Sequence, residues 1–159
     1  MAKLQKLLEG YIWVDEIANQ VVVELKKTSD ILEEVHNRFF ESYGISNTKF
    51  NVLVILYKGP SEGMILSEIG ELMLVTKGNI TGLIDRLEKQ GYVKRIRDEI
   101  DRRKVTALMT EEGNLFTKQV IDDYREWTKK ILLHLETEEK SLLIQLLKKL
   151  QNGIVHSSL

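Results

Sequence analysis

Residues 66–109 read LSEIGELMLVTKGNITGLIDRLEKQGYVKRIRDEIDRRKVTALM, and their spacing allows the fold class to be predicted. In the middle of this segment the apolar residues recur every three or four positions, as on one face of a helix. They are Ile80, Leu83, Ile84 and Leu87. Thr76 is suited to cap this helix at its start and Gly91 to end it. A shorter helix is expected over residues 66–73, so a helix-turn-helix is predicted over residues 66–90.

After Gly91 the sequence changes to two six-residue runs that favour β-strands, residues 92–97 and 104–109. A polar link joins them, and a β-hairpin is therefore predicted over residues 92–109. A helix-turn-helix followed by such a hairpin forms a winged helix, whose core we place at residues 46–110.

One more helix is expected before the helix-turn-helix. Ser46 or Asn47 can cap it, and the loop around the only proline, Pro60, ends it. Its core-facing residues are expected to be Phe50, Leu53, Val54 and Tyr57. The core-facing residues of the short helix that follows are expected to be Leu66, Ile69, Leu72 and Met73.

Long helices are predicted on both sides of this core, in residues 1–44 and 111–159, because apolar residues recur there with helical spacing. The predicted fold class is mostly α with a small β-hairpin wing: a winged helix-turn-helix flanked by long N- and C-terminal dimerisation helices. With 159 residues, the chain is expected to form a single domain over residues 1–159.

Composition excludes several classes of protein. The sequence has no cysteine, which excludes disulfides, thiolate metal sites and thiol redox switches. No run of about eighteen apolar residues predicts a membrane span, and residues 1–10 resemble an amphipathic helix more than a secretory signal, so a cytoplasmic location is expected. The sequence has no HExxH motif and no phosphate-binding glycine loop, and we expect neither an enzyme nor a bound cofactor.

Charge is distributed unevenly along the chain. Residues 76–104 contain nine Lys or Arg and five Asp or Glu, a net charge of +4, and the remaining residues therefore carry −5. A basic segment in an otherwise acidic chain points to a polyanionic partner.

The predicted helix over residues 77–90 has an outward face suited to duplex DNA. That face holds Gly78, Gly82, Asp85, Arg86 and Lys89, with Asn79 and Thr81 at its sides. Glycine inside a helix costs roughly 1 kcal/mol relative to alanine, unless its backbone approaches another molecule closely. The free N–H groups and the Thr76 hydroxyl could also bind a phosphate. The alternative is a packing helix whose glycines touch another helix.

The hairpin supplies further basic residues. Arg102 and Arg103 lie at the end of its loop and could enter a narrow minor groove. Lys94, Arg95 and Arg97 could pair with phosphates. Alternatively, the loop is a solvated charged turn in which Asp98 and Asp101 neutralise the arginines, and Asp101 could equally hold an arginine in position.

Several of these segments together resemble the MarR family of bacterial winged-helix transcription regulators. The segments are LSEI (66–69), VTKGNITGLIDRLE (75–88), GYV (91–93), Asp98, DRR (101–103) and MTEEG (109–113). The resemblance spans residues 18–153, which we identify as a MarR-type helix-turn-helix domain. Leu74 stands where the family often has a small turn residue, Gly82 where an arginine is frequent, and Glu99 where proline is common.

The resemblance implies a homodimer in which the first and last helices of both subunits interlock and present two winged helices to a pseudo-palindromic operator. Apolar stripes support this independently, at Leu4, Leu7, Leu8 and Tyr11 and again over residues 142–154, although they could pack together within one chain. The residues expected to bind DNA are Thr76, Lys77, Gly78, Asn79, Thr81, Gly82, Arg86, Lys94, Arg95, Arg97, Asp101, Arg102 and Arg103.

The resemblance also implies release from DNA by a small apolar or phenolic ligand. Aromatic and sulfur side chains that could line its site are Trp13, His36, Phe39, Phe40, Tyr43 and Met64, which could equally be core or interface residues. A metal sensor using His36 and Glu33 is a weaker alternative, and we expect no metal site.

The expected function is therefore a sequence-specific DNA-binding transcription regulator, a homodimeric repressor released by a ligand. The alternative is a winged-helix module that binds a protein or ligand and not DNA. Such a module would depend little on Lys77, Arg102 and Arg103.

Overall fold

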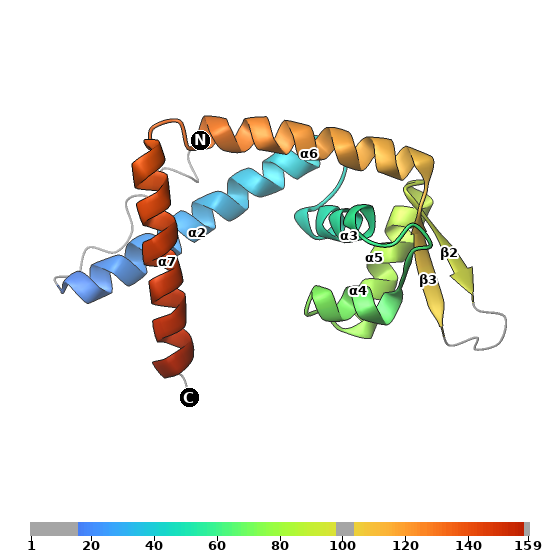
Figure 1. The fold of residues 1–159 in the computed structure, drawn as a ribbon, viewed down its shortest axis with the longest axis horizontal. Coiled ribbons are helices and arrows are strands. Elements are labelled where there is room, and N and C mark those ends of the chain that lie inside the picture. Colours follow the sequence, from blue (N-terminus) through green and yellow to red (C-terminus); the bar gives the residue numbers. More distant parts are fainter. Residues whose placement is uncertain (1–15, 98–103, 158–159) are drawn as a thin grey trace. The chain divides into compact units, whose positions relative to one another are not determined.

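The computed structural model describes residues 16–97 and 104–157, apart from the side chain of Lys77. In chain order the elements are α2 (Ile17–Glu41), α3 (Asn47–Lys58), β1 (Met64–Ile65), α4 (Leu66–Leu72), α5 (Lys77–Lys89), β2 (Val93–Arg97), β3 (Val105–Met109), α6 (Glu111–Ile131) and α7 (Thr137–Ser157) (Figure 1). The predicted class, mostly α with a small β wing, is confirmed. The chain divides into two compact units, residues 1–117 and 118–159.

Helix α2 matches the long helix expected before Gly44. It ends at Glu41, and Gly44 adopts a φ of 69°, a conformation that glycine reaches without strain. Near this end the Phe40 ring packs against Phe50 of α3, with ring centroids 4.8 Å apart. Phe40 is only 1% exposed, so this aromatic contact fixes the end of α2 on the winged-helix core.

Helix α3 begins as predicted, since the Ser46 side chain accepts a hydrogen bond from the Lys49 backbone N–H at 3.2 Å. The predicted core face was partly wrong. Tyr57 is 38% exposed, whereas Val52 and Leu56 are buried although they were not predicted to be. The reason is that α3 contacts α2, α5 and β3 together, so its buried surface is wider than one stripe and is displaced from Tyr57.

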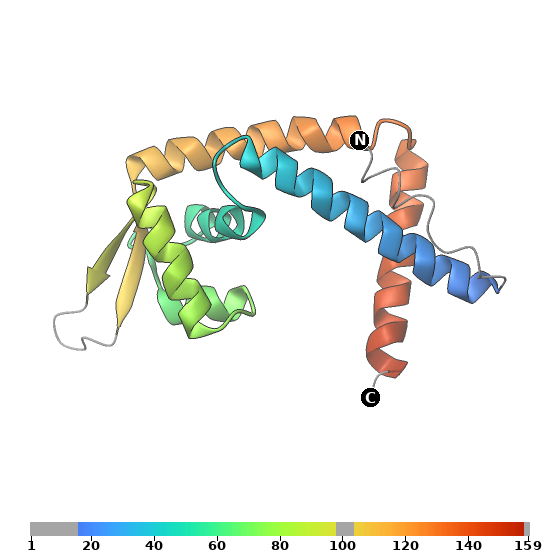
Figure 2. The same ribbon diagram turned by 180° about the vertical axis from the view of Figure 1, so that it is seen from behind.

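The helix-turn-helix is confirmed. Ile69 of α4 and Ile80, Ile84 and Leu87 of α5 are completely buried, and a Cβ on Gly70 would lie 3.5 Å from Ile80 Cγ2, so the two helices cross closely. Leu72 was expected in the core but is 63% exposed. It is the last residue of α4, where the chain already turns away from the core. Helix α5 contacts β2, and Figure 2 shows α5 next to the hairpin of β2 and β3 (Figure 2).

The wing hairpin is confirmed and gains a third strand that was not predicted. The antiparallel sheet has the order β1-β3-β2, with Val93 opposite Met109 and Arg97 opposite Val105. The added strand β1 is only two residues long and pairs Met64 with Ala107. Gly63 precedes it at a φ of 90°, and a Cβ there would lie 2.4 Å from the Ala107 carbonyl oxygen, so only glycine allows this pairing.

The start of α6 is tied to the base of the wing. Thr110 Oγ1 donates a hydrogen bond to the Gly91 carbonyl at 2.7 Å and accepts one from the Gly113 N–H at 2.9 Å. The rings of Tyr92 and Phe116 stack with centroids 4.2 Å apart. These contacts fix the orientation of the first turns of α6 on the hairpin.

Residues 118–157 contain the remainder of α6, the link 132–136 and all of α7. No residue of α7 is buried, and its exposed apolar residues are Leu142, Leu143, Ile144, Leu146, Ile154 and Val155. Such a long apolar helix surface needs a covering partner. Within the described residues, no helix has the length and apolar character needed to cross a membrane.

Candidate nucleic-acid interface

The start of α5 has the geometry expected of a capped helix. The Thr76 hydroxyl accepts a hydrogen bond from the Asn79 N–H at 3.4 Å, and the Thr76 carbonyl accepts one from the Ile80 N–H at 3.1 Å. Both Thr76 and Asn79 are exposed. This end of the helix can therefore be approached from solvent, and its N–H groups favour an anion there.

The outward face of α5 is formed by the residues that the helical spacing predicted. Gly78, Asn79, Arg86 and Lys89 are exposed, and Thr81, Gly82 and Asp85 are half-buried. Core-facing Leu83 and Leu87 lie on the opposite side and are buried. A polar face of this kind on a short, firmly packed helix can be presented to a groove of the duplex.

The two glycines of this face do not serve packing among the described residues. A Cβ added at Gly78 would meet no atom within 4 Å, and one at Gly82 would meet only the Arg86 guanidinium at 3.8 Å. The alternative in which these glycines touch another helix therefore finds no support within the described chain. The space in front of them is open to a second molecule.

Arg95 has partners that sequence spacing did not reveal. Its Nε donates a hydrogen bond to Glu88 Oε2 at 2.7 Å, its backbone N–H donates one to Glu88 Oε1 at 2.9 Å, and its guanidinium also pairs with Asp85. The hydrogen bonds from Arg95 lower the pKa of the Glu88 carboxyl below its ordinary value. Both carboxylates belong to α5, so this cluster joins the wing strand to the helix.

This arrangement bears on the predicted phosphate contacts of the wing. Lys94 and Arg97 are exposed on β2, as a phosphate contact requires. The Arg95 guanidinium is instead held by carboxylates, and its pairing with phosphate stays a prediction. The loop residues Asp98, Glu99, Asp101, Arg102 and Arg103 and the side chain of Lys77 lie outside the described part of the chain.

Comparison with known proteins identifies the family. A sequence model of the MarR family matches residues 45–105, which include α3 to β2, the first residue of β3 and the Arg95 cluster. The HTH-type transcriptional regulator PrsX of Escherichia coli is 30% identical over 141 residues, which cover 89% of this chain and 83% of PrsX. The chain belongs to the MarR family.

Other relatives of this MarR-family chain cover most of its length. The HTH-type transcriptional repressor YetL of Bacillus subtilis is 27% identical over 139 residues, 87% of this chain and 83% of YetL. A MarR-like transcription regulator from Bacillus cereus has a TM-score of 0.74 at 25% identity and covers 86% of this chain, with 96% of its own chain matched.

A solved DNA complex has the same fold. Sco3205 of Streptomyces coelicolor, a MarR-family regulator crystallised with DNA, matches with a TM-score of 0.75 at 20% identity, over 91% of both chains. At this identity the likeness concerns the fold alone, and it agrees with the winged helix built above from α4, α5 and the sheet.

Some of the residues expected to line a ligand site belong instead to the core or the sheet of this MarR-family fold. Phe40 is buried against Phe50, and Met64 belongs to β1. Phe39 and Tyr43 form an aromatic pair with centroids 5.2 Å apart, and His36 Nδ1 donates a hydrogen bond to the Leu32 carbonyl at 2.7 Å. Trp13 lies outside the described residues.

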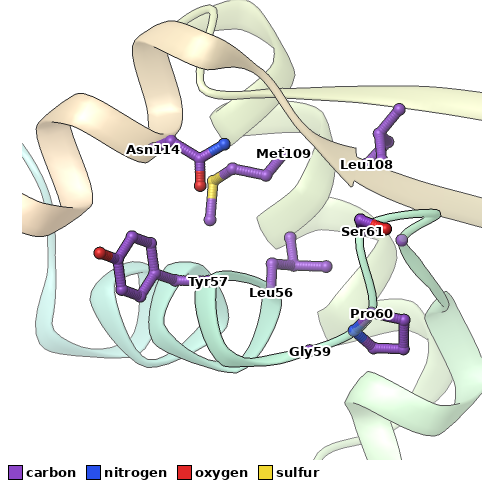
Figure 3. Close-up of a pocket in the computed structure, with 9 residues that line it drawn as sticks. Leu56, Tyr57, Gly59, Pro60, Ser61, Leu108, Met109 and Asn114 are labelled. Atoms are coloured by element: carbon purple, nitrogen blue, oxygen red, sulfur yellow. The ribbon is translucent and has the colours of Figure 1, made fainter.

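A hollow of about 240 Å³ lies elsewhere, between the loop after α3, strand β3 and the start of α6. Figure 3 shows Met109 and Leu56 beside it, with Asn114 near the Met109 sulfur (Figure 3). None of the described residues predicted to line a ligand site borders this hollow. As for the metal alternative, no cluster of three or more His, Cys, Asp or Glu side chains suited to a metal ion occurs among residues 16–97 and 104–157.

Two features of the site were not anticipated from the sequence. The first is the role of Asp85 and Glu88, whose spacing of three residues on α5 could have suggested a shared cation. The second is Leu74, which adopts a φ of 54° in the turn between α4 and α5. The one signal in the sequence was that a leucine stands at this position, where MarR proteins often have a small residue.

Proposed function

We propose that this MarR-family chain is a sequence-specific DNA-binding transcription regulator that acts in the cytoplasm as a homodimeric repressor and is released from its operator by a small molecule. The observation that carries the proposal is the exposed face of α5, where Gly78 has open space in front of it and Thr76 caps the helix. Glycine there allows the helix backbone to approach base edges closely.

The charge of the surrounding residues supports the same partner. The segment 76–104 has a net charge of +4, and Arg86, Lys89, Lys94 and Arg97 are exposed on α5 and β2. Cations at these positions can contact phosphates, and in the proposed complex they set the position of α5 in the major groove. In this proposal Arg102 and Arg103 extend the contact to an adjacent groove.

Dimerisation is supported by the apolar helices outside the winged-helix core. In α7, Leu143, Leu146 and Ile154 are exposed, and in α2 Ile17 and Val22 are exposed as well. Covering such surfaces favours a second copy of the chain. A two-fold dimer would place its two α5 helices about 34–36 Å apart, one turn of the duplex.

For the effector we propose a small apolar or phenolic compound that contacts the aromatic residues near the end of α2. Phe39, Tyr43 and His36 remain candidates, because none of them is fully buried. Phe40 is buried and would only support their positions. Such a ligand would act by changing the spacing of the two α5 helices.

The experiment that tests the proposed function is binding of the purified full chain to duplex DNA. One labelled duplex comes from upstream of the protein's own gene, and duplexes selected from a randomised pool serve if that site does not bind. Affinity is measured at two salt concentrations, against a scrambled duplex of equal length. We expect binding selective for the chosen sequence and a steep loss of affinity with salt.

The competing function, a winged helix that binds only proteins or ligands, predicts a different result. Such a module would show equal, weak affinity for every duplex and no enrichment from the pool. That outcome would overturn the proposed function.

A further inference from the structure

Leu74 has an unusual conformation for its residue type. Among the described residues it is the only one other than glycine with a positive φ, 54°. Its side chain is 94% exposed, so burial of the leucine offers no compensation for the strained backbone. Glycine or asparagine would adopt this φ with less strain. A strained, exposed leucine therefore suggests a contact that is made only with a partner.

The turn holds Leu74 firmly in place. The Leu74 N–H donates a hydrogen bond to the Glu71 carbonyl at 3.1 Å, and the next N–H, of Val75, donates one to the Gly70 carbonyl at 3.0 Å. Val75 packs against the core. The side chain of Leu74 borders a hollow of about 430 Å³, which is lined by Ser67, Gly70, Glu71, Leu74, Val75 and Ile80.

The position of Leu74 relative to α5 determines what it can reach. Leu74 precedes the N-cap Thr76 by two residues, and two residues span at most about 7 Å. The major groove is about 12 Å wide. If the start of α5 enters the groove, as proposed above, Leu74 lies within the same groove or at its edge.

The residues around the hollow determine which group of the DNA major groove Leu74 could contact. Glu71 at its border carries a negative charge and repels phosphate. Leu74 and Val75 present apolar carbon, and the apolar group that the major groove displays on a base is the 5-methyl of thymine. A leucine at this position favours thymine over cytosine, which lacks that methyl group.

We propose that Leu74 is a specificity-determining residue that contacts a thymine 5-methyl group in each half of the operator. The inference rests on the proposed function and adds a base preference to it. It assigns a role to a residue of the turn, outside the predicted set of DNA-binding residues.

The test combines a change in the protein with the removal of a single methyl group from DNA. Duplexes bound by the full wild-type chain are selected from a randomised pool, and each thymine of the best one is replaced in turn by uracil, which lacks only the 5-methyl. Affinities are measured for the wild type and for Leu74→Gly and Leu74→Asn, which suit the positive φ. Leu72→Ala is the matched control, since Leu72 is exposed nearby but does not border the hollow.

We expect one thymine in each half-site at which uracil lowers the affinity of the wild type and of Leu72→Ala by about fourfold, the effect of one buried methyl group. Leu74→Gly and Leu74→Asn should bind the thymine and uracil duplexes equally. Thermal unfolding should show both variants folded and no less stable than the wild type. Equal sensitivity to uracil in the wild type and in both Leu74 variants, or no sensitivity in any protein, would overturn this inference alone. Failure to select any duplex would overturn the proposed function, and this inference with it.

Discussion

Arg95 of the wing strand β2 and Glu88 of helix α5 are joined by two hydrogen bonds, of 2.7 Å from the arginine Nε and 2.9 Å from its backbone N–H. The carboxylate therefore holds both the side chain and the backbone of the strand. Because α5 and the wing would meet neighbouring parts of one duplex, this contact fixes the angle between two DNA-binding elements. We therefore propose that Arg95 acts as a positioning residue.

If Arg95 positions the wing, Arg95→Gln and Glu88→Gln should weaken operator binding by similar factors, about fivefold or less, since the Arg95–Glu88 ion pair is partly exposed to solvent. The slope of log affinity against log salt should not change, because no phosphate contact is lost. The measurement is a salt titration of binding for each variant. Arg97→Gln, an exposed residue of the same strand, is the control and should reduce the slope by about 1.

A different pattern would identify Arg95 as a phosphate contact. Arg95→Gln would then reduce the salt slope as Arg97→Gln does. Glu88→Gln would leave Asp85 as the remaining carboxylate partner of the guanidinium and would strengthen binding.

Replacing Arg102 and Arg103 together with alanine should weaken operator binding by at least about tenfold and reduce the salt slope by about 2. Both charges belong to the hairpin loop, which we propose reaches an adjacent groove. Fluorescence anisotropy with the selected duplex measures the affinity, and circular dichroism checks that the variant is folded. Unchanged affinity would remove the wing loop from the mechanism.

Thr110 provides a test of how α6 is fixed to the wing. Thr110→Ala should lower the free energy of unfolding by about 1–2 kcal/mol, because the hydroxyl accepts from the Gly113 N–H as an N-cap does and also bonds the Gly91 carbonyl. Thr110→Ser keeps the hydroxyl and should retain most of that stability. Urea denaturation measures both. Equal losses in the two variants would show that the methyl group, and not the hydroxyl, is responsible.

Leu146→Glu tests the proposed dimer. Leu146 is exposed on α7, so a carboxylate there should not disturb the isolated chain but would be buried without a partner in a dimer interface. Sedimentation velocity should show loss of the dimer and a single chain of 18.4 kDa. Gln145→Glu introduces the same charge at the adjacent exposed position and should remain dimeric. A wild type that is itself monomeric would contradict the proposal.

Most of the helices could be predicted because the spacing of apolar residues along a helix is visible in a short stretch of sequence. Ile80, Ile84 and Leu87 repeat every three or four residues, and all three are buried in α5. Strand β1 could not be predicted in this way, since two residues, Met64–Ile65, contain no alternation to detect. The exposure of Tyr57 and Leu72 likewise depends on which elements cover each helix, and the local pattern does not contain that information.

The part of the candidate site that lies on the single helix α5 could be predicted from the sequence. The outward residues of α5 were correct because the opposite face is fixed once the core face is known. The partners of Arg95 were not predictable, because Asp85 and Glu88 are ten and seven residues away and meet it only when β2 lies against α5. The positive φ of Leu74 could not be predicted from the sequence either, since leucine does not favour that conformation.

The central claim is that the glycine-bearing face of α5 enters the major groove, and Gly78→Leu tests it most directly. A Cβ added at Gly78 would meet no described atom within 4 Å, and leucine favours helix more than glycine does by roughly 1 kcal/mol, so the variant should be at least as stable as the wild type. Its affinity for the selected duplex should nevertheless fall by about tenfold or more, because the added side chain occupies the space that the bases need. A folded Gly78→Leu variant that binds the same duplex as tightly as the wild type would contradict the account.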